Sequence, residues 1–198
     1  MSPQSKARTK PQTVSLETYF EMEMNAETRH EFWNGEVRAM AYTSPEHGII
    51  VHNLDRLLGN CIVDKDCILV PNDRMLFVPS CNKIYYPDLM LVCGKRIYHQ
   101  YKGKMVATLN PKVIIEVLSD STEKDDKEGK WDCYKRIPSL QQYFLVSQDR
   151  KRVEMFQRTE DEKKWLQQIF DNSDENLTIG DCEISLKNIY HKVEFSLK

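Results

Sequence analysis

Apolar residues recur at helical spacing in two segments of the first third of the chain. Between residues 15 and 25 they return every three or four positions, which predicts an amphipathic helix. The second segment opens with Ser44 and Pro45, a favourable N-cap and first helical position. Its apolar face comprises Ile50, Leu54, Leu57, Leu58 and Cys61. We therefore expect two helices that each pack one face against a core.

A hairpin and several short strands are expected around the second helix. The Asn34-Gly35 pair separates the runs 30–33 and 36–40, and an Asn-Gly pair in this setting is a strong hairpin signal. Short apolar runs bounded by turn residues predict three further strands, at 67–70, 75–78 and 89–93.

The second half of the chain predicts the centre of a sheet. The run 113–118 alternates so little that both of its faces are expected to be buried, whereas 94–110 is polar and is expected to be a loop. Thr122, with Asp125 three residues on, can cap a helix that ends before Pro138. Three more strands and a final short helix are expected at 143–146, 152–156, 165–170 and near 188–190. The predicted fold class is α/β (α+β), a sheet with flanking helices.

Length and charge limit the number of domains and the kinds of partner. The 198 residues contain no repeat or linker, so we expect one domain at 13–198 after a flexible arm at 1–12. The formal charge of −2 provides no overall field that would attract nucleic acid, so any such contact must be local. The longest apolar run, Leu89–Cys93, is too short to span a membrane. The arm lacks the apolar core of a secretory signal, which favours a cytoplasmic location.

The cysteines are expected to be reduced. They are Cys61, Cys67, Cys81, Cys93, Cys133 and Cys182. No two of them form the C-x-x-C pair that structural zinc sites use. Because disulfides are rare in the cytosol, we expect reduced thiols, some of them in the core.

Two carboxylates interrupt segments that otherwise predict buried strands. Asp88 precedes the run Leu89–Cys93, and Glu116 lies within 113–118. A buried carboxylate needs a cation, a hydrogen-bond network or a raised pKa. The simpler interpretation is that each lies at a strand end or pairs with an arginine. Two carboxylates that converge from adjacent strands would instead suit a hard divalent cation, Mg²⁺ or Mn²⁺.

The helix expected before Pro138 carries a third candidate group. Asp126, Lys130 and Tyr134 are spaced four residues apart and therefore share one face, which could meet the two carboxylates. From this geometry we expect Asp126 and Tyr134 to hold Lys130 in place. Taken alone, an Asp-Lys pair at this spacing is more often an ordinary solvated ion pair.

Pro87-Asp88, Glu116 and a following lysine stand in the order of the PD-(D/E)XK nuclease motif. Seven segments extend the match: Arg29–Glu36, Ser44–His47, Asn72–Met75, Tyr86–Leu89, Ile115–Thr122, Lys130–Tyr134 and Ile137–Leu140. In this order they resemble the Uma-type family of restriction endonuclease-like proteins, a branch of that superfamily in which most members have no assigned substrate. The resemblance covers roughly residues 14–193.

The resemblance implies a restriction endonuclease-like fold, with a central mixed β-sheet flanked by helices, and a metal-dependent phosphodiesterase site. It makes Asp88 and Glu116 the metal ligands and Lys130 the catalytic lysine. We expect the backbone carbonyl of Val117 as a further ligand to Mg²⁺ or Mn²⁺. In the superfamily the lysine stands two residues after the acid, where this chain has Leu118, so the role passes to the helix.

Three further residues match family positions. Glu31 resembles the additional acidic residue that many such nucleases bring to the metal, although a salt bridge at the hairpin edge explains it equally well. His47 also matches, and its simpler role is a place in the first turn of the second helix. Asp73 matches as well, and its simpler role is in a turn.

The expected function is that of an endonuclease acting on DNA, in a homodimer. Basic residues that could follow a DNA backbone, or simply keep the surface soluble, are Lys95, Arg96, Lys124, Lys127, Lys135 and Arg136. One alternative is a catalytically inactive protein of this fold that acts as a nucleic-acid-binding or regulatory module. Another is a structural partner whose contact surface includes Tyr85-Tyr86 and Tyr143-Phe144, aromatic residues that buried strands explain as well.

Overall fold

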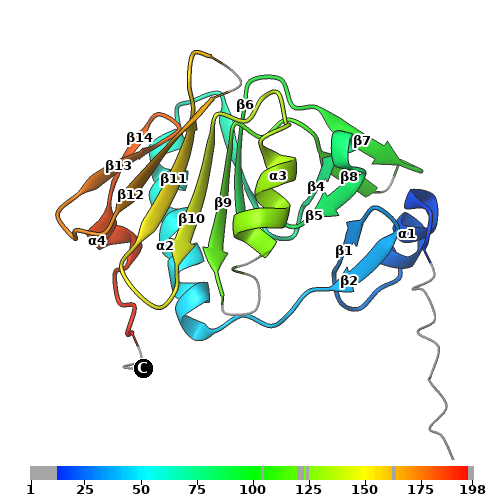
Figure 1. Ribbon diagram of the computed structural model, residues 1–198, viewed down its shortest axis with the longest axis horizontal. Helices are drawn as coiled ribbons and strands as arrows, with labels where there is room; N and C mark the ends of the chain where they lie inside the picture. Colours follow the sequence, from blue (N-terminus) through cyan, green and yellow to red (C-terminus); the bar gives the residue numbers. More distant parts are fainter. Residues whose placement is uncertain (1–12, 104, 120–122, 124, 162–163, 196–198) are drawn as a thin grey trace, which may run out of the picture.

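Within the residues that the structure describes, the protein combines two six-stranded sheets and one two-stranded sheet with short and long helices (Figure 1). The computed structural model describes residues 13–103, 105–119, 123, 125–161 and 164–195. The expected arm at 1–12 and the expected helix cap Thr122 lie outside this part of the chain. The predicted α+β class, with mixed sheets flanked by helices, is confirmed.

The helical elements are α1 (Leu16–Glu23), α2 (Pro45–Ile62), the 3-10 turn η1 (Pro79–Cys81), the π-helix η2 (Asp125–Lys130), α3 (Trp131–Tyr134) and α4 (Leu186–Ile189). The first sheet has the order β2-β1-β5-β4-β8-β7, with β1 (His30–Trp33), β2 (Glu36–Ala39), β4 (Met75–Val78), β5 (Lys83–Tyr85), β7 (Tyr98–Tyr101) and β8 (Met105–Thr108). The second has the order β12-β11-β10-β9-β6-β3, with β3 (Cys67–Pro71), β6 (Leu89–Cys93), β9 (Val113–Leu118), β10 (Gln142–Ser147), β11 (Val153–Arg158) and β12 (Trp165–Phe170). The small sheet pairs β13 (Asn176–Ile179) with β14 (Cys182–Ser185). None of the described helices is long and apolar enough to cross a membrane.

The N-terminal elements form where the sequence predicts them. Ser15 caps α1, and Ser44 caps α2 by accepting a hydrogen bond from the amide of His47 at 3.1 Å. The turn between β1 and β2 places Asn34 at φ 50° and Gly35 at φ 104°. These two residue types adopt positive φ at little cost, which is why the Asn-Gly pair closes the hairpin.

The expected loop at 94–110 contains two strands instead. β8 pairs in parallel with β4, and β7 pairs with β8 as the edge of the first sheet. The sequence of β7 is polar and neither of its faces is fully buried, so hydrophobic alternation does not separate it from a loop. Its pairing with β8 makes it a strand. The sequence analysis also did not predict β5, β13 and β14, although β13 and β14 alternate between buried and less buried residues, because each is only three or four residues long.

Strand β9 lies inside the second sheet, parallel to β10 and antiparallel to β6, and all six of its residues are buried. Val113 and Ile115 pack into the core that includes α2 and α4. Ile114 and Leu118 pack into the core that includes residues of α3. Because strand side chains alternate, Glu116 shares the face of Ile114 and Leu118 and points toward α3.

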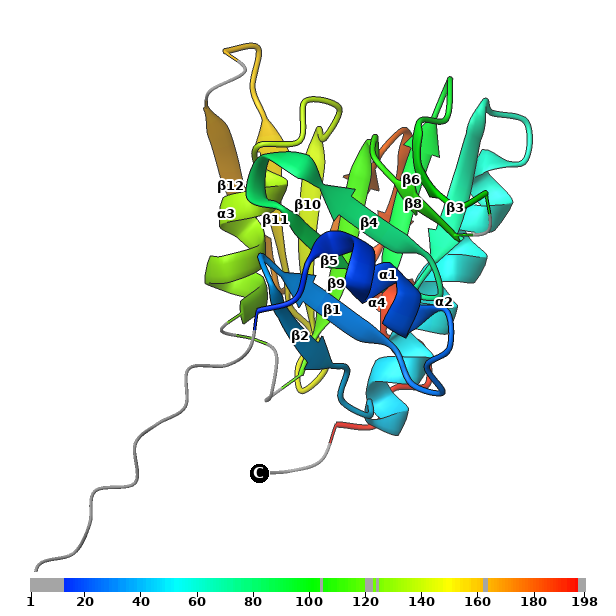
Figure 2. The ribbon, with the colours of Figure 1, turned by 90° about the vertical axis from the view of Figure 1, so that its right-hand side faces the viewer.

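The first sheet contributes Leu76, Val78 and Tyr85 to the core that includes residues of α3. Figure 2 shows it in front of the second sheet, with α1 on its outer side. Tyr19 and Phe20 of α1 pack there against Phe32 and Ile84 of the sheet. The hydrophobic pattern of the individual strands does not predict this arrangement of the two sheets.

The expectation of reduced cysteines is wrong, because all six cysteines form disulfides. Cys61–Cys182 joins α2 to β14, Cys67–Cys93 joins β3 to β6, and Cys81–Cys133 joins η1 to α3. The partners are 121, 26 and 52 residues apart in the chain. Local spacing therefore carries no sign of the pairing, which only the folded arrangement of the elements creates.

The paired aromatic residues belong to the core. Tyr85, Tyr86, Tyr143 and Phe144 are at most 5% exposed. This contradicts the alternative in which they form a contact surface, and it confirms the buried-strand interpretation.

Gly180 and Gly59 provide a matched test of the packing. Gly180 has φ +62°, and an added Cβ would lie 2.8 Å from Cδ2 of the buried Leu91. Gly59 lies within α2 with nothing within 4 Å of an added Cβ. We expect Gly180→Ala to lower the free energy of unfolding by about 2 kcal/mol or more, since it adds both strain and overpacking. Gly59→Ala should raise it by about 0.5–1 kcal/mol. Urea titration measures both, and equal effects would contradict the assigned backbone at Gly180.

Candidate active site

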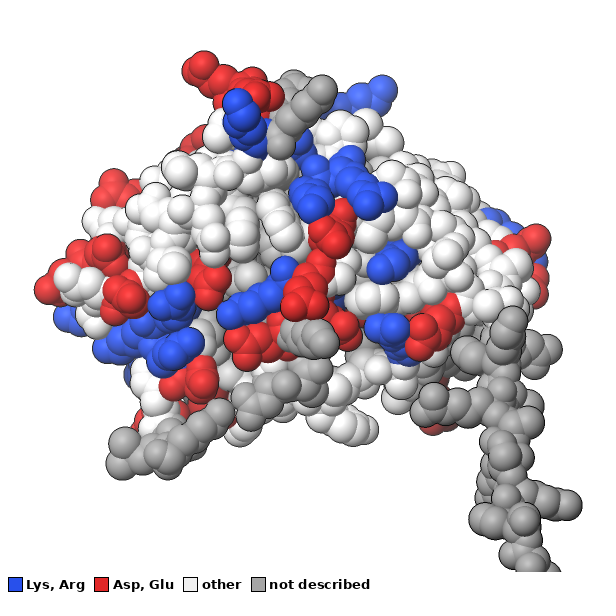
Figure 3. Space-filling view, in the orientation of Figure 1, with Lys and Arg blue, Asp and Glu red and all other residues white. Residues whose placement is uncertain are grey.

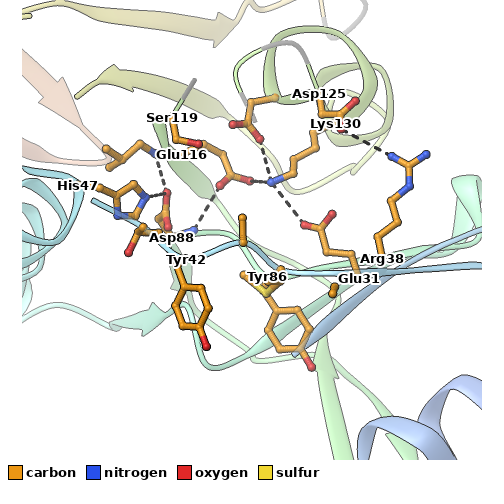
Figure 4. A pocket seen from close by; sticks show the side chains of 16 residues that line it. Glu31, Arg38, Tyr42, His47, Tyr86, Asp88, Glu116, Ser119, Asp125 and Lys130 are labelled. Carbon is orange, nitrogen blue, oxygen red and sulfur yellow. Dashed lines mark hydrogen bonds and ion pairs between the residues drawn. The ribbon is translucent and has the colours of Figure 1, made fainter. Parts of the chain in front are cut away.

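A cavity of about 210 Å³ opens between the hairpin of the first sheet, the start of α2, and strands β6 and β9 (Figure 4). Five carboxylates line it, together with two permanently charged cations. The carboxylates are Glu31, Asp88, Glu116, Asp125 and Asp126, and the cations are Arg38 and Lys130. The site therefore has an excess of negative charge that its own arginine and lysine do not balance.

The two strand carboxylates lie side by side because of the sheet register. Leu89 pairs with Ile115 across the antiparallel strands β6 and β9, which sets Asp88 opposite Glu116. The amide of Asp88 points at Glu116 Oε2 at 3.4 Å, a long contact. Asp88 Oδ2 accepts a hydrogen bond of 2.7 Å from the amide of Val117. The two carboxylates thus come from adjacent strands, as their positions in the sequence predict.

His47 fixes the orientation of Asp88. It lies in the first turn of α2, and its side chain is 5% exposed. Its Nε2 lies 3.1 Å from Asp88 Oδ2, and since a carboxylate only accepts, Nε2 carries the proton in this contact. His47 is therefore part of the site, whereas Asp73 lies in the turn before β4 and lines a separate cavity.

Lys130 is the centre of the opposite wall. Its Nζ lies 2.8 Å from Asp126 Oδ1, 3.1 Å from Glu116 Oε1 and 3.5 Å from Glu31 Oε1. The side chains of Lys130 and Asp126 are only 8% and 2% exposed. Their ion pair is therefore buried, and the alternative of a solvated ion pair on the helix surface is wrong. Glu31 likewise turns toward Lys130 instead of forming a salt bridge at the hairpin edge.

The helix that carries Lys130 has two parts. Residues Asp125–Lys130 form the π-helix η2, and the α-helix resumes at Trp131. π-helical turns are rare and often mark functional sites. Tyr134, one turn further on, donates from its hydroxyl to Glu116 Oε1 at 2.9 Å. The four-residue spacing predicted this shared face, but the widened turn is visible only in the structure.

Burial and neighbouring charge set the protonation of the site. Burial raises the pKa of the Glu116 carboxyl well above its ordinary range; Lys130 opposes this, while Asp126, Asp88 and Glu31 add to it. For Lys130, burial lowers the pKa, but the carboxylates of Glu116, Glu31 and Asp126 outweigh it and hold the pKa well above the usual value. Lys130 is therefore an ammonium ion that keeps its protons and donates hydrogen bonds.

Trp33 is a supporting residue that sequence reasoning missed. Its Nε1 donates to Glu31 Oε2 at 2.8 Å, which directs the other oxygen of Glu31 toward Lys130. A Cβ at Gly129 would lie 3.2 Å from the Trp33 ring, so a glycine allows the π-helix to approach the hairpin closely. In the sequence, Gly129 stands inside a helical pattern, where glycine costs about 1 kcal/mol relative to alanine. This unfavourable position is the feature from which the close approach to the hairpin could have been inferred.

Two of the basic residues that were expected to follow a DNA backbone form ion pairs with neighbouring carboxylates. Lys127 pairs with Glu123 at 2.9 Å, and Lys135 pairs with Asp132 at 2.6 Å. Lys124 lies outside the described residues. Lys127 and Lys135 are therefore already paired with carboxylates and do not form a free basic track beside the cavity.

The donor set suits a hard cation. Among the described residues, no three side chains of the His, Cys, Asp or Glu type are grouped to hold a metal ion by themselves. Asp88, Glu116 and the carbonyl of Val117 offer only oxygens, and Mg²⁺ typically takes one or two carboxylates and completes its shell with water and phosphate. The residues present fit such an ion, and they do not fit zinc, which prefers nitrogen and sulfur ligands.

Comparison with known structures supports the fold. The chain matches a crystal structure from Anabaena variabilis ATCC 29413, described as that of "a putative nuclease belonging to DUF820". The TM-score is 0.70, and the match covers 88% of this chain and 96% of the other. The sequences are 14% identical, so the likeness shows the shared fold alone.

Two proteins of Synechocystis sp. (strain ATCC 27184 / PCC 6803 / Kazusa) are similar in sequence. The uncharacterized protein sll1609 is 34% identical over 148 residues, which is 75% of this chain and 82% of that protein. The uncharacterized protein slr1290 is 30% identical over 148 residues, which is 75% of this chain and 76% of that protein. The Uma2 family model, described as "Putative restriction endonuclease", matches residues 16–186. This chain therefore belongs to the Uma2 family and has a restriction endonuclease-like fold.

Proposed function

We propose that this protein is a Mg²⁺- or Mn²⁺-dependent endonuclease that hydrolyses phosphodiester bonds of DNA. The observation that supports it best is the pair of carboxylates on adjacent strands, Asp88 and Glu116, with the Lys130 ammonium 3.1 Å from Glu116. Five carboxylates against two permanent cations leave an acidic cavity that a divalent cation would balance. The homodimer and the cytoplasmic location stay predictions.

The cation would be held by the carboxylates of Asp88 and Glu116 and by the backbone carbonyl of Val117. A divalent cation at this place lowers the pKa of a bound water and neutralises the charge of a scissile phosphate. His47 keeps Asp88 oriented through its 3.1 Å contact, and the amide of Val117 holds the same oxygen. The ligands are thus oriented before a cation arrives.

Lys130 acts as a cation beside the phosphate. As its pKa is held well above the usual value, the ammonium orients the attacking water or stabilises the charge of the transition state. Asp126 and Tyr134 position Lys130 and Glu116. Glu31, held by Trp33, is proposed as the additional acidic residue of the site.

Calorimetric titration with Mn²⁺ tests the metal site. We expect saturable binding to the wild-type protein and its loss in Asp88→Asn and Glu116→Gln, which keep the shape and remove the charge. Asp73→Asn is the matched control, because Asp73 lines a separate cavity, and it should bind as the wild type does. Circular dichroism must first show that all variants fold. Equal binding by wild type and site variants would overturn the metal assignment and favour the inactive binding module.

The affinity for Mn²⁺ should increase with pH. Burial raises the pKa of Glu116, so part of the free protein carries a proton there that the cation must displace. Low pH favours the protonated form and therefore weakens binding. Calorimetry in two buffers of different ionisation enthalpy measures the released protons. A binding heat that is the same in both buffers, with affinity independent of pH, would contradict this prediction.

Lys130→Met should separate catalysis from metal binding. The change leaves the carboxylates of Glu116, Glu31 and Asp126 without their shared cation, so we expect about 3–5 kcal/mol of destabilisation without metal. Mn²⁺ should restore part of this stability, while DNA cleavage falls by about 10²-fold or more. Urea titrations with and without Mn²⁺, beside a cleavage assay, measure the three effects. Undiminished cleavage would exclude the catalytic role of Lys130.

A further inference from the structure

Tyr42 is fully exposed although it lines the acidic cavity. The next most exposed of the described tyrosines is Tyr98, at 41%. An aromatic side chain usually covers apolar surface, so complete exposure at the rim of a polar cavity needs a reason. In Figure 4 the Tyr42 ring points away from the carboxylates of Asp88 and Glu116.

Tyr42 ends a continuous apolar wall, which we define as Ala39–Tyr42. All four residues are exposed, and all four line the cavity. Met40 is 36% exposed and Tyr42 is 100% exposed. The cavity thus has one acidic side, which suits a cation and a phosphate, and one apolar side, which suits neither.

The wall is attached at both ends. The amide of Met40 donates to the carbonyl of Arg29 at 3.0 Å. Beyond the wall, Ser44 caps α2 and its hydroxyl donates to Gln148 Oε1 at 3.0 Å. These anchors hold the Tyr42 backbone beside the cavity, while the ring itself stays open to contact.

We propose that Tyr42 and the apolar wall form a stacking platform for an unpaired nucleobase next to the phosphodiester that is cleaved. The inference rests on the proposed nuclease function and narrows its substrate class to single-stranded or locally unpaired DNA. A phosphate held at the acidic side through the proposed cation would place a neighbouring base within reach of the apolar side, because both sides line one cavity. Inside a duplex the faces of that base are covered by stacked neighbours, so only an unpaired base can lie against the ring.

The protein has no net positive charge that would bind nucleic acid through electrostatic attraction alone. The formal charge is −2, and Figure 3 shows Lys and Arg interspersed with Asp and Glu rather than gathered in a continuous band. Proteins that follow a duplex depend on contacts between many basic residues and the phosphates. Here stacking supplies affinity that the electrostatic field does not.

Fluorescence anisotropy with labelled oligothymidylate and with a labelled blunt-ended duplex of two fully complementary strands tests the platform. Ca²⁺ replaces Mg²⁺ so that binding is observed without turnover. We expect the wild type to prefer the single strand, and Tyr42→Ala to weaken single-strand binding by about 5-fold or more. Tyr42→Phe keeps the ring and should bind as the wild type does, whereas Tyr42→Leu keeps apolar area without a ring and should resemble Tyr42→Ala. Tyr98→Ala, on strand β7, is the control and should change nothing.

A base analogue provides a direct signature of stacking. 2-Aminopurine in a single strand should lose fluorescence on binding to the wild type and to Tyr42→Phe, and not on binding to Tyr42→Leu. If the wild type binds DNA and Tyr42→Ala binds the single strand equally well, the platform is overturned while the nuclease proposal stands. If the wild type binds neither DNA at saturating Mn²⁺ or Ca²⁺, the proposed function fails and the platform fails with it.

Discussion

The buried ammonium of Lys130 is the interaction on which the site depends. Its Nζ lies within 3.5 Å of carboxylate oxygens from Glu31, Glu116 and Asp126, and nearly all of these groups' surface is removed from water. Taking such charges out of water costs several kcal/mol for each ion, and only close geometry offsets it. The hairpin, β9 and the π-helix must therefore meet at one point. A displacement of any one of them would leave a buried charge without its partner.

Strand register, side-chain alternation and close helix packing bring the hairpin, β9 and the π-helix together. The register between β6 and β9 sets Asp88 beside Glu116, and strand alternation turns Glu116 toward the helix that carries Lys130. Gly129 lets that helix approach the hairpin, where Trp33 holds Glu31. The disulfide Cys81–Cys133 joins the same helix to the first sheet. Residues that touch no substrate thus determine where the charged groups lie.

The site joins two kinds of chemistry in one cavity. Its acidic side has more carboxylates than permanent cations, which is the condition under which a divalent cation is favoured. The apolar wall beside it would be of no use to a cation or a phosphate. A nucleotide carries both a charged and an aromatic part, so a cavity with these two sides suits a strand whose base is unpaired. Membership of the Uma2 family agrees with nuclease chemistry.

The sequence by itself determined the elements whose signals are local. Asn34-Gly35 predicts the hairpin, Ser44-Pro45 predicts the start of α2, and the carboxylates of Asp88 and Glu116 stand out in apolar strands, since turn, cap and strand preferences act over a few residues. The same positions, with Lys130, gave the candidate site. Only the tertiary structure decided that the cysteines pair, that β7 is a strand, and that Lys130 and Asp126 are buried together. The disulfides join segments up to 121 residues apart, and β7 is a strand because it pairs with β8, which in turn pairs with the distant β4. Burial is a property of the assembled sheets that no local pattern contains.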